Sequence, residues 1–222
     1  METTALYNTN AKTQTKDSQA GISPAMAREL LMAGNKRFMD REPIQRNLTG
    51  QVGDTSTGQF PFAAVVSCID SRIPTEIVFD QGIGDIFNAR VAGNFVNEDI
   101  LGSLEFACKL AGSKLIVVMG HTSCGAVKGA CDHAKLGNLT QMLDKIMPAV
   151  NAIETGEGVD RSSKNLDFVN TVAKKNVEMT IEDIKSKSPV LYEMYQAGEI
   201  GIVGAMYDVK TGQVSFMDEP LS

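Results

Sequence analysis

The sequence predicts an α/β fold, with a mostly parallel sheet of about four core strands plus an antiparallel edge strand, flanked by helices. Runs of small and β-branched residues at 63–67, 115–119 and 200–207 carry no charge, which is typical of strands buried on both faces. Segments with helical spacing of apolar residues lie between these runs, and such alternation is typical of a parallel sheet. A turn at 210–212 predicts a closing hairpin with a last strand at 213–217.

The N-terminal part of the chain predicts a tail followed by a helical arm. Residues 1–22 are polar and are predicted to form a disordered or arm-like tail, whereas residues 23–222 are predicted to form a single domain. Ser23 followed by proline is a favourable helix start and predicts a helix over 25–39. Residues 41–60 contain a proline and several glycines and are expected to form a long loop.

The remaining elements follow from apolar spacing and from glycine and proline positions. A strand is expected at 86–89, and a turn-rich break at 154–161 separates two helical regions. Helices are expected at 74–79, 100–111, from about 124 onward, and at 139–153, 166–187 and 190–197.

Composition excludes several classes of partner. The chain has 222 residues and a formal net charge of −6, and nucleic acids or anionic membranes select proteins with a basic face. No apolar run reaches the roughly 20 residues of a membrane span, and the first 20 residues lack the apolar core of a signal peptide. A cytoplasmic location is therefore expected. There, the cysteines at 68, 108, 124 and 131 are expected to be ligands or buried thiols rather than disulfides.

Soft metal ligands follow two of the predicted strands. Cys68 ends the first run, and His121 and Cys124 follow the run at 115–119. In parallel sheets, chemistry gathers at the carboxyl ends of strands, so these side chains are expected to meet. Thiolate and imidazole are the ligands that zinc prefers, and a catalytic zinc site keeps its fourth position for water. Asp70 and Arg72 lie nearby, at a spacing that allows a carboxylate–guanidinium pair.

Each ligand taken alone has a simpler interpretation. A buried cysteine at a strand end is usually a small core residue, and a lone H-x-x-C spacing is weak evidence for a metal. A structural zinc module would need a fourth cysteine or histidine nearby. The nearest, Cys131 and His133, are expected on a helix that runs away from the site, and Cys108 is expected in the core. Three ligands at two strand ends beside an Asp–Arg pair favour a catalytic site.

Two motifs resemble those of the β-class carbonic anhydrases, and in particular of their plant-like branch. They are C-I-D-S-R at 68–72 and G-H-T-S-C-G at 120–125, and the resemblance runs from about residue 25 to 218. It implies a parallel four-stranded core with an extra edge strand. It also implies a homodimer or higher homo-oligomer, in which the N-terminal helix embraces a second subunit and the active sites lie at the interface.

The resemblance also implies a metal, a mechanism and a substrate. One zinc ion per chain would be held by Cys68, His121 and Cys124, with water or, in a resting form, Asp70 in the fourth place. Asp70, paired with Arg72, would accept a hydrogen bond from the zinc-bound water, which selects hydroxide. The expected reaction is the reversible hydration of carbon dioxide to bicarbonate and a proton, by attack of zinc-bound hydroxide. Hydrolysis of carbonyl sulfide or carbon disulfide on the same scaffold is the alternative.

Further positions match the substrate pocket of that branch. Gln59, nine residues before Cys68, resembles a glutamine that binds substrate oxygen, and Phe87 and Ala92 fall where an apolar wall is expected. Gly125 could offer its backbone N–H at the start of the next helix. Phe106 stands where the branch often has tyrosine, so no hydroxyl role is expected there.

Overall fold

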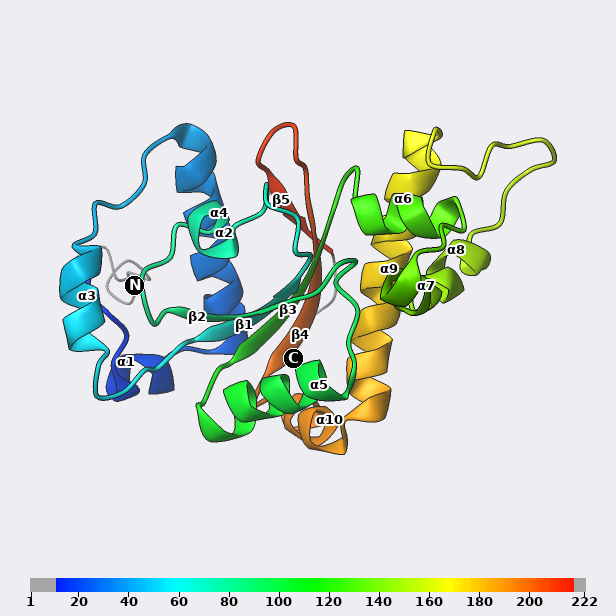
Figure 1. Cartoon of the computed structure of the whole chain (residues 1–222). Helices are drawn as coiled ribbons and strands as arrows, with labels where there is room; N and C mark the ends of the chain where they lie inside the picture. The colour runs from blue at the N-terminus through cyan, green and yellow to red at the C-terminus, as the bar shows by residue number, and fades with distance from the viewer. Residues whose placement is uncertain (1–10, 218–222) are drawn as a thin grey trace.

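A five-stranded sheet forms the centre of the protein. The computed structural model describes residues 11–217 and places the strands in the order β2-β1-β3-β4-β5 (Figure 1). The first four strands run parallel and β5 pairs antiparallel with β4. Their bounds are Ala63–Ser67 for β1, Ile86–Arg90 for β2, Leu115–His121 for β3, Gly201–Tyr207 for β4 and Val214–Phe216 for β5. The predicted α/β class, with its antiparallel edge strand, is confirmed.

Both faces of the sheet are covered by helices, as the uncharged runs predicted. Val65 and Val117 face the side on which α2 (Pro24–Asp40) packs. Val66 and Val118 face the opposite side, where they pack with residues of three helices. These helices are α5 (Glu98–Glu105), α9 (Leu166–Lys187) and α10 (Pro189–Gln196). Since successive strand residues point to opposite faces, this two-sided burial fixes which residues of each strand can reach a given helix.

Part of the segment predicted as a disordered or arm-like tail lies within the described residues. Residues 1–10 lie outside the description, but Lys16–Ala20 form the short helix α1, capped by Thr15. The Gln19 amide of this helix donates hydrogen bonds to the carbonyls of Pro61 and Ala111, both 2.8 Å away. A buried amide satisfied by two carbonyls anchors the segment to its own chain, which polar composition alone does not reveal.

The next elements largely follow the sequence. Helix α2 begins where Ser23 accepts a hydrogen bond from the Met26 N–H, as predicted. The predicted long loop at 41–60 contains an additional helix, α3 (Leu48–Asp54), because the Asn47 side chain caps its first turn.

The segment between β1 and β3 contains two short helices. They are α4 (Thr75–Val78) and α5 (Glu98–Glu105), and α5 continues into a π-helical turn, Phe106–Leu110. The helix predicted at 100–111 is thus real, but its last turn is wider than an α-helix. Such turns are frequent at functional sites.

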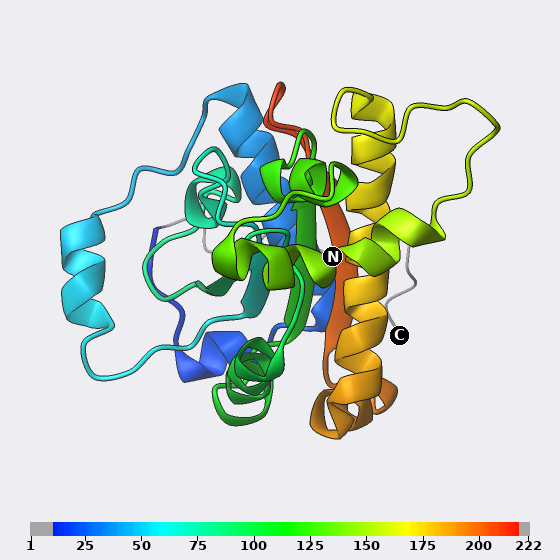
Figure 2. The same ribbon diagram turned by 45° about the vertical axis from the view of Figure 1, so that its right-hand side comes forward.

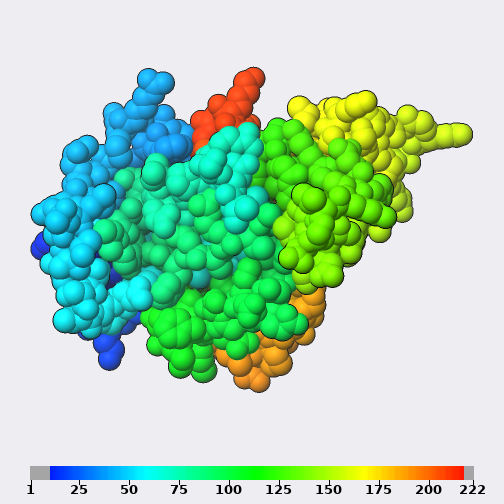
Figure 3. Space-filling view, viewed as in Figure 1, coloured from blue at the N-terminus to red at the C-terminus, as the bar shows by residue number. Residues whose placement is uncertain are grey.

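Three short helices follow β3, and two of them pack on the long helix α9, which itself lies on β3 and β4. Figure 2 shows α6, α7 and α8 beside the long helix α9, and Figure 3 shows the connection between α8 and α9 projecting from the molecule. The helix predicted at 139–153 is broken near Lys145, with Pro148 in the first turn of α8, because proline has no N–H to continue a helix. The bounds are Gly125–Cys131 for α6, Gly137–Asp144 for α7, Met147–Ala152 for α8 and Pro189–Gln196 for α10.

No helix within residues 11–217 is long and apolar enough to cross a membrane. The cytoplasmic location and the single-domain organisation stay predictions from the sequence.

Candidate metal centre

Two neighbouring strands bring three predicted ligands together. Cys68 directly follows β1, His121 ends β3, and Cys124 precedes α6. The two Sγ atoms are 4.0 Å apart, and the ligand atoms of all three residues lie within 4.8 Å of one another. All three side chains are buried. The expected meeting of the two strand ends is therefore present in the structure.

The turn between β3 and α6 sets the position of Cys124. Ser123 adopts a left-handed conformation with φ of 56°, and its N–H donates to the Asn170 side chain at 2.9 Å. This turn places Cys124 at the N-cap of α6. Its sulfur thereby lies 4.0 Å from the Cys68 sulfur, so the local fold brings the two cysteine ligands together.

His121 presents one nitrogen to the cluster. Its Nδ1 lies 3.0 Å from the Thr122 carbonyl oxygen, which can only accept, so Nδ1 carries the proton. Nε2 then has a free lone pair, and it is buried without a hydrogen-bond partner among the described residues. A buried nitrogen without a partner is costly, and a metal ion is the natural partner for it.

The pKa values of the two thiols in the cluster are shifted in opposite directions. A hydrogen bond with Cys124 lowers the pKa of Cys68 to about 4, assisted by the Gly93 N–H. The same bond and burial raise the pKa of Cys124 above its usual range, because a second negative charge beside the first is unfavourable. Two thiolates this close call for a positive ion between them.

The predicted Asp–Arg pair lies at the edge of the cluster. Arg72 donates from Nε to one oxygen of Asp70 at 2.9 Å and from Nη2 to the other at 2.7 Å. This fork holds the pKa of the Asp70 carboxyl well below its usual range. The Asp70 Oδ2 atom lies 3.9 Å from Nε2 of His121, so an ionised acceptor faces the ligand atoms.

The donor set fits a zinc ion with an open position. Two sulfurs and one imidazole nitrogen are the donors that zinc prefers, and within residues 11–217 no fourth cysteine or histidine joins the cluster. Cys131 and Cys108 lie elsewhere, and burial raises the pKa of their thiols to about 11 and about 12 respectively. Those two thiols are protonated at neutral pH and have the character of core residues.

The four predicted substrate-pocket residues separate into two groups. Ala92 precedes Gly93, whose N–H lies 3.4 Å from the Cys68 sulfur, and Gly125 follows Cys124, so both are beside the cluster. Gln59 is exposed and precedes β1, whereas Cys68 follows β1, a strand of five residues that spans about 16 Å.

Phe87, like Gln59, lies near the start of β1 and away from the cluster. It pairs with Ala64 near the start of β1, and its ring packs edge-to-face on Phe106 with centroids 6.1 Å apart. The fold of one chain therefore does not bring Gln59 or Phe87 to the cluster of that chain.

Arg90 is a site residue that the sequence analysis did not identify. It ends β2 and donates from Nε to the Cys68 carbonyl at 2.9 Å and from Nη2 to the Asp70 carbonyl at 2.7 Å. Both bonds fix the backbone that carries a ligand and the carboxylate. A charged residue at the carboxyl end of a parallel strand was the available signal.

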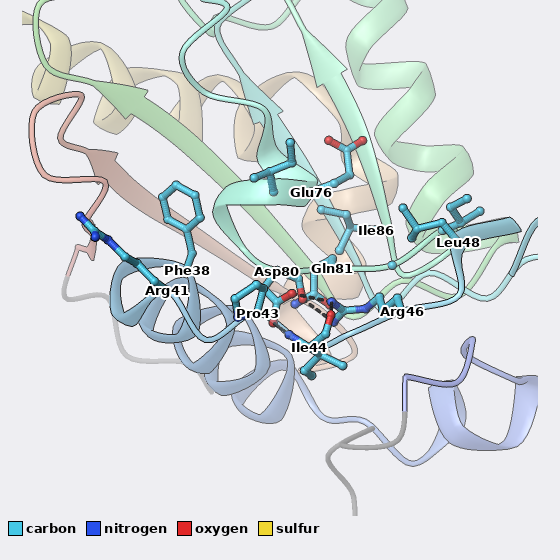
Figure 4. A pocket seen from close by; sticks show the side chains of 14 residues that line it. Phe38, Arg41, Pro43, Ile44, Arg46, Leu48, Glu76, Asp80, Gln81 and Ile86 are labelled. Carbon is cyan, nitrogen blue, oxygen red and sulfur yellow. Dashed lines mark hydrogen bonds and ion pairs between the residues drawn. The ribbon is translucent and has the colours of Figure 1, made fainter.

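A groove lined by residues of α2, α4 and the loop between α2 and α3 lies away from the metal centre. It has a volume of about 800 Å³ and lies between the end of α2, the following loop and α4. Figure 4 shows Arg46 bonded to Asp80 at this groove, with Phe38 and Ile44 nearby. Arg37 binds the same carboxylate. Asp80 is thus paired with two arginines, and within residues 11–217 no cluster of metal ligands lies at this groove.

Comparisons with known proteins agree with the geometry. The family model described as carbonic anhydrase matches residues 63–214. Carbonic anhydrase 2 of Mycobacterium tuberculosis is 32% identical over 203 residues, which cover 88% of this chain and 94% of that protein.

Two solved structures share the fold. A β-carbonic anhydrase of Aspergillus fumigatus superposes with a TM-score of 0.66 at 24% identity, covering 88% of this chain and 91% of the other. One of two tetrameric β-carbonic anhydrases of Sordaria macrospora gives 0.67 at 22% identity, covering 88% and 95%.

We predict that the purified protein binds one zinc ion per chain and that Cys124→Ser loses it. A serine hydroxyl is a harder and weaker ligand than a thiolate, and three protein ligands are needed for retention. Metal analysis of the two proteins measures this, with Cys108→Ser as the matched control because that buried thiol lies outside the cluster. Full zinc content in Cys124→Ser would contradict the ligand assignment.

Proposed function

We propose that this chain, which belongs to the carbonic anhydrase family and has the fold of its β class, catalyses the zinc-dependent reversible hydration of carbon dioxide to bicarbonate and a proton. The observation that carries the proposal is the buried Cys68–His121–Cys124 cluster with the Asp70–Arg72 pair at its edge. Three donors with an open fourth position suit catalysis, whereas a closed set of four would suit a structural ion.

A zinc ion held by the three side chains would supply Lewis acidity, which makes water nucleophilic near neutral pH. The protein supplies the rest. His121 is fixed in one tautomer by the Thr122 carbonyl, and the Gly93 N–H near the Cys68 sulfur favours the thiolate form of Cys68.

The Asp70–Arg72 pair would control which molecule reacts. Because Arg72 binds both oxygens, Asp70 stays ionised and can only accept a hydrogen bond. An acceptor at this position favours a nucleophile that still carries a proton, such as hydroxide, and it orients that proton away from the incoming substrate. The fork also prevents Asp70 from turning freely towards the ligand atoms.

The substrate pocket would be completed by a second copy of the chain. Gln59 and Phe87 lie far from the metal cluster of their own chain, yet Phe87 lines an apolar groove of about 370 Å³ together with Ala64 and Phe106. Phe106 and Leu110, in the π-helical turn, are 51% and 77% exposed. Such large exposed apolar side chains beside a groove are typical of an interface. We therefore infer that the chain forms a homodimer or a larger homo-oligomer through this surface. The Phe87 side of one copy would then face the metal cluster of the other.

The first experiment measures carbon dioxide hydration by the purified protein, with and without a zinc chelator. We expect activity that the chelator removes and that added zinc restores, because the three buried donors would hold the ion on which the reaction depends. Carbonyl sulfide and carbon disulfide serve as comparison substrates. Their hydrolysis without any hydration of carbon dioxide would contradict the proposal.

Arg72→Ala tests the Asp–Arg pair. We expect zinc content to stay unchanged and kcat/KM to fall on the order of 100-fold, because Asp70 loses the partner that keeps it ionised and oriented. Arg72→Lys is the matched variant, since it keeps the charge without the planar fork and should show an intermediate loss. If Arg72→Ala kept the kcat/KM of the parent protein, the pair would be a structural salt bridge only.

Phe106→Asp tests the shared site. A charge in the apolar groove should separate the copies, so we expect monomers that retain zinc but have lost most activity. Sedimentation and metal analysis measure both, and Val159→Asp, in the projecting segment, is the control because Val159 is also exposed. A parent protein that is monomeric and fully active would exclude the shared site.

A further inference from the structure

Helix α9 contacts the loop that carries Cys124 and a second turn that lies against the Cys68 sulfur. Asn170 accepts a hydrogen bond from the Ser123 N–H, in the loop before Cys124. Asn176 donates from Nδ2 to the Gly93 carbonyl at 2.7 Å, in the turn that follows β2. The second contact leads directly to a ligand atom, because the Gly93 N–H lies 3.4 Å from the Cys68 sulfur.

The turn at Gly93 has a conformation that needs support. Gly93 has a φ of 85° and Asn94 a φ of 44°, so two successive residues lie in the left-handed region. A Cβ atom at Gly93 would lie 2.4 Å from Cδ1 of Ile146, so only glycine fits. For Asn94 the left-handed conformation costs free energy, on the order of 1–3 kcal/mol for a residue other than glycine. Contacts from outside the turn must offset this cost.

Asn176 is well placed to provide such a contact. Its side chain is 3% exposed and lies on a helix whose neighbouring residues Val172, Ala173 and Val177 belong to the core. An amide in such surroundings is unfavourable unless it is hydrogen-bonded. The bond to Gly93 is 2.7 Å long and buried, so water cannot easily replace it.

We propose that Asn176 is a positioning residue for the metal: it holds Gly93 so that the Gly93 N–H stays on the Cys68 sulfur, and thereby strengthens zinc binding by the cluster. The inference rests on the zinc assignment of the proposed function. An N–H directed at a thiolate stabilises its negative charge and fixes the direction of its remaining lone pairs. Without Asn176, the turn could relax and Cys68 would lose both effects.

The test compares zinc affinity in Asn176→Leu and Asn176→Ala with that of the parent protein, by competition with a chromogenic chelator. Leucine keeps the volume and removes the donor, whereas alanine also removes the volume. We expect both variants to bind zinc 10- to 100-fold more weakly, the range found when partners of metal ligands are lost. Thr180→Val is the control, because Thr180 is equally buried on α9 but bonds only to the Asn176 carbonyl within the helix.

A spectroscopic readout separates positioning from stability. In cobalt-substituted protein, the thiolate-to-metal charge-transfer band should shift in the Asn176 variants and stay unchanged in Thr180→Val. Thermal unfolding of the metal-free proteins measures the structural cost of each substitution. If Asn176→Leu does not fold, Asn176→Ala decides the matter.

Two results would overturn different statements. A parent protein that binds no zinc would contradict the proposed function. A parent protein that binds zinc, with Asn176 variants of equal affinity and unchanged cobalt spectra, would leave the proposed function intact and show that Asn176 only stabilises the fold.

Discussion

The parallel pairing of β1 with β3 is the constraint on which the rest of the site depends. Its register places Ser67 beside Met119, so Cys68 leaves β1 where β3 delivers His121. A slip of one residue would turn every side chain of a strand to the opposite face. Because both faces are buried against helices, such a slip would expose apolar residues on both sides. Core packing thus fixes the distance between ligands from two distant parts of the sequence.

A second constraint is the unfavourable free energy of placing negatively charged groups in the protein interior. Two thiols and a carboxylate lie within one small region, and two of these groups receive hydrogen-bond donors from other parts of the chain. Cys68 accepts from the Gly93 N–H, and Asp70 accepts from the guanidinium of Arg72. Such donors stabilise anions before any metal arrives, which keeps the reorganisation on binding small.

The residues predicted to form the site lie at two separate places in the chain. The metal ligands and the Asp–Arg pair lie at the carboxyl end of β1, whereas Gln59 and Phe87 lie near its start. A strand of five residues is too long for a side chain to span. This separation is explained if Gln59 and Phe87 of one chain contribute to the metal site of a neighbouring chain. This exchange would link catalysis to assembly, because a monomer would then have the metal but lack part of its pocket.

The sequence by itself determined which segments form the buried strands and which residues end them. Uncharged runs that end near Cys68 and His121 were enough to predict the sheet and the ligand cluster. Buried strands and helix caps such as Ser23 depend on residues that are close together in the sequence, so a local pattern can predict them. Only the tertiary structure decided that Arg90 and Asn176 support the ligand loops, since their partners are 20 to 83 residues away in the chain. Hydrogen bonds across such separations depend on how helices and strands pack, and no local pattern encodes them.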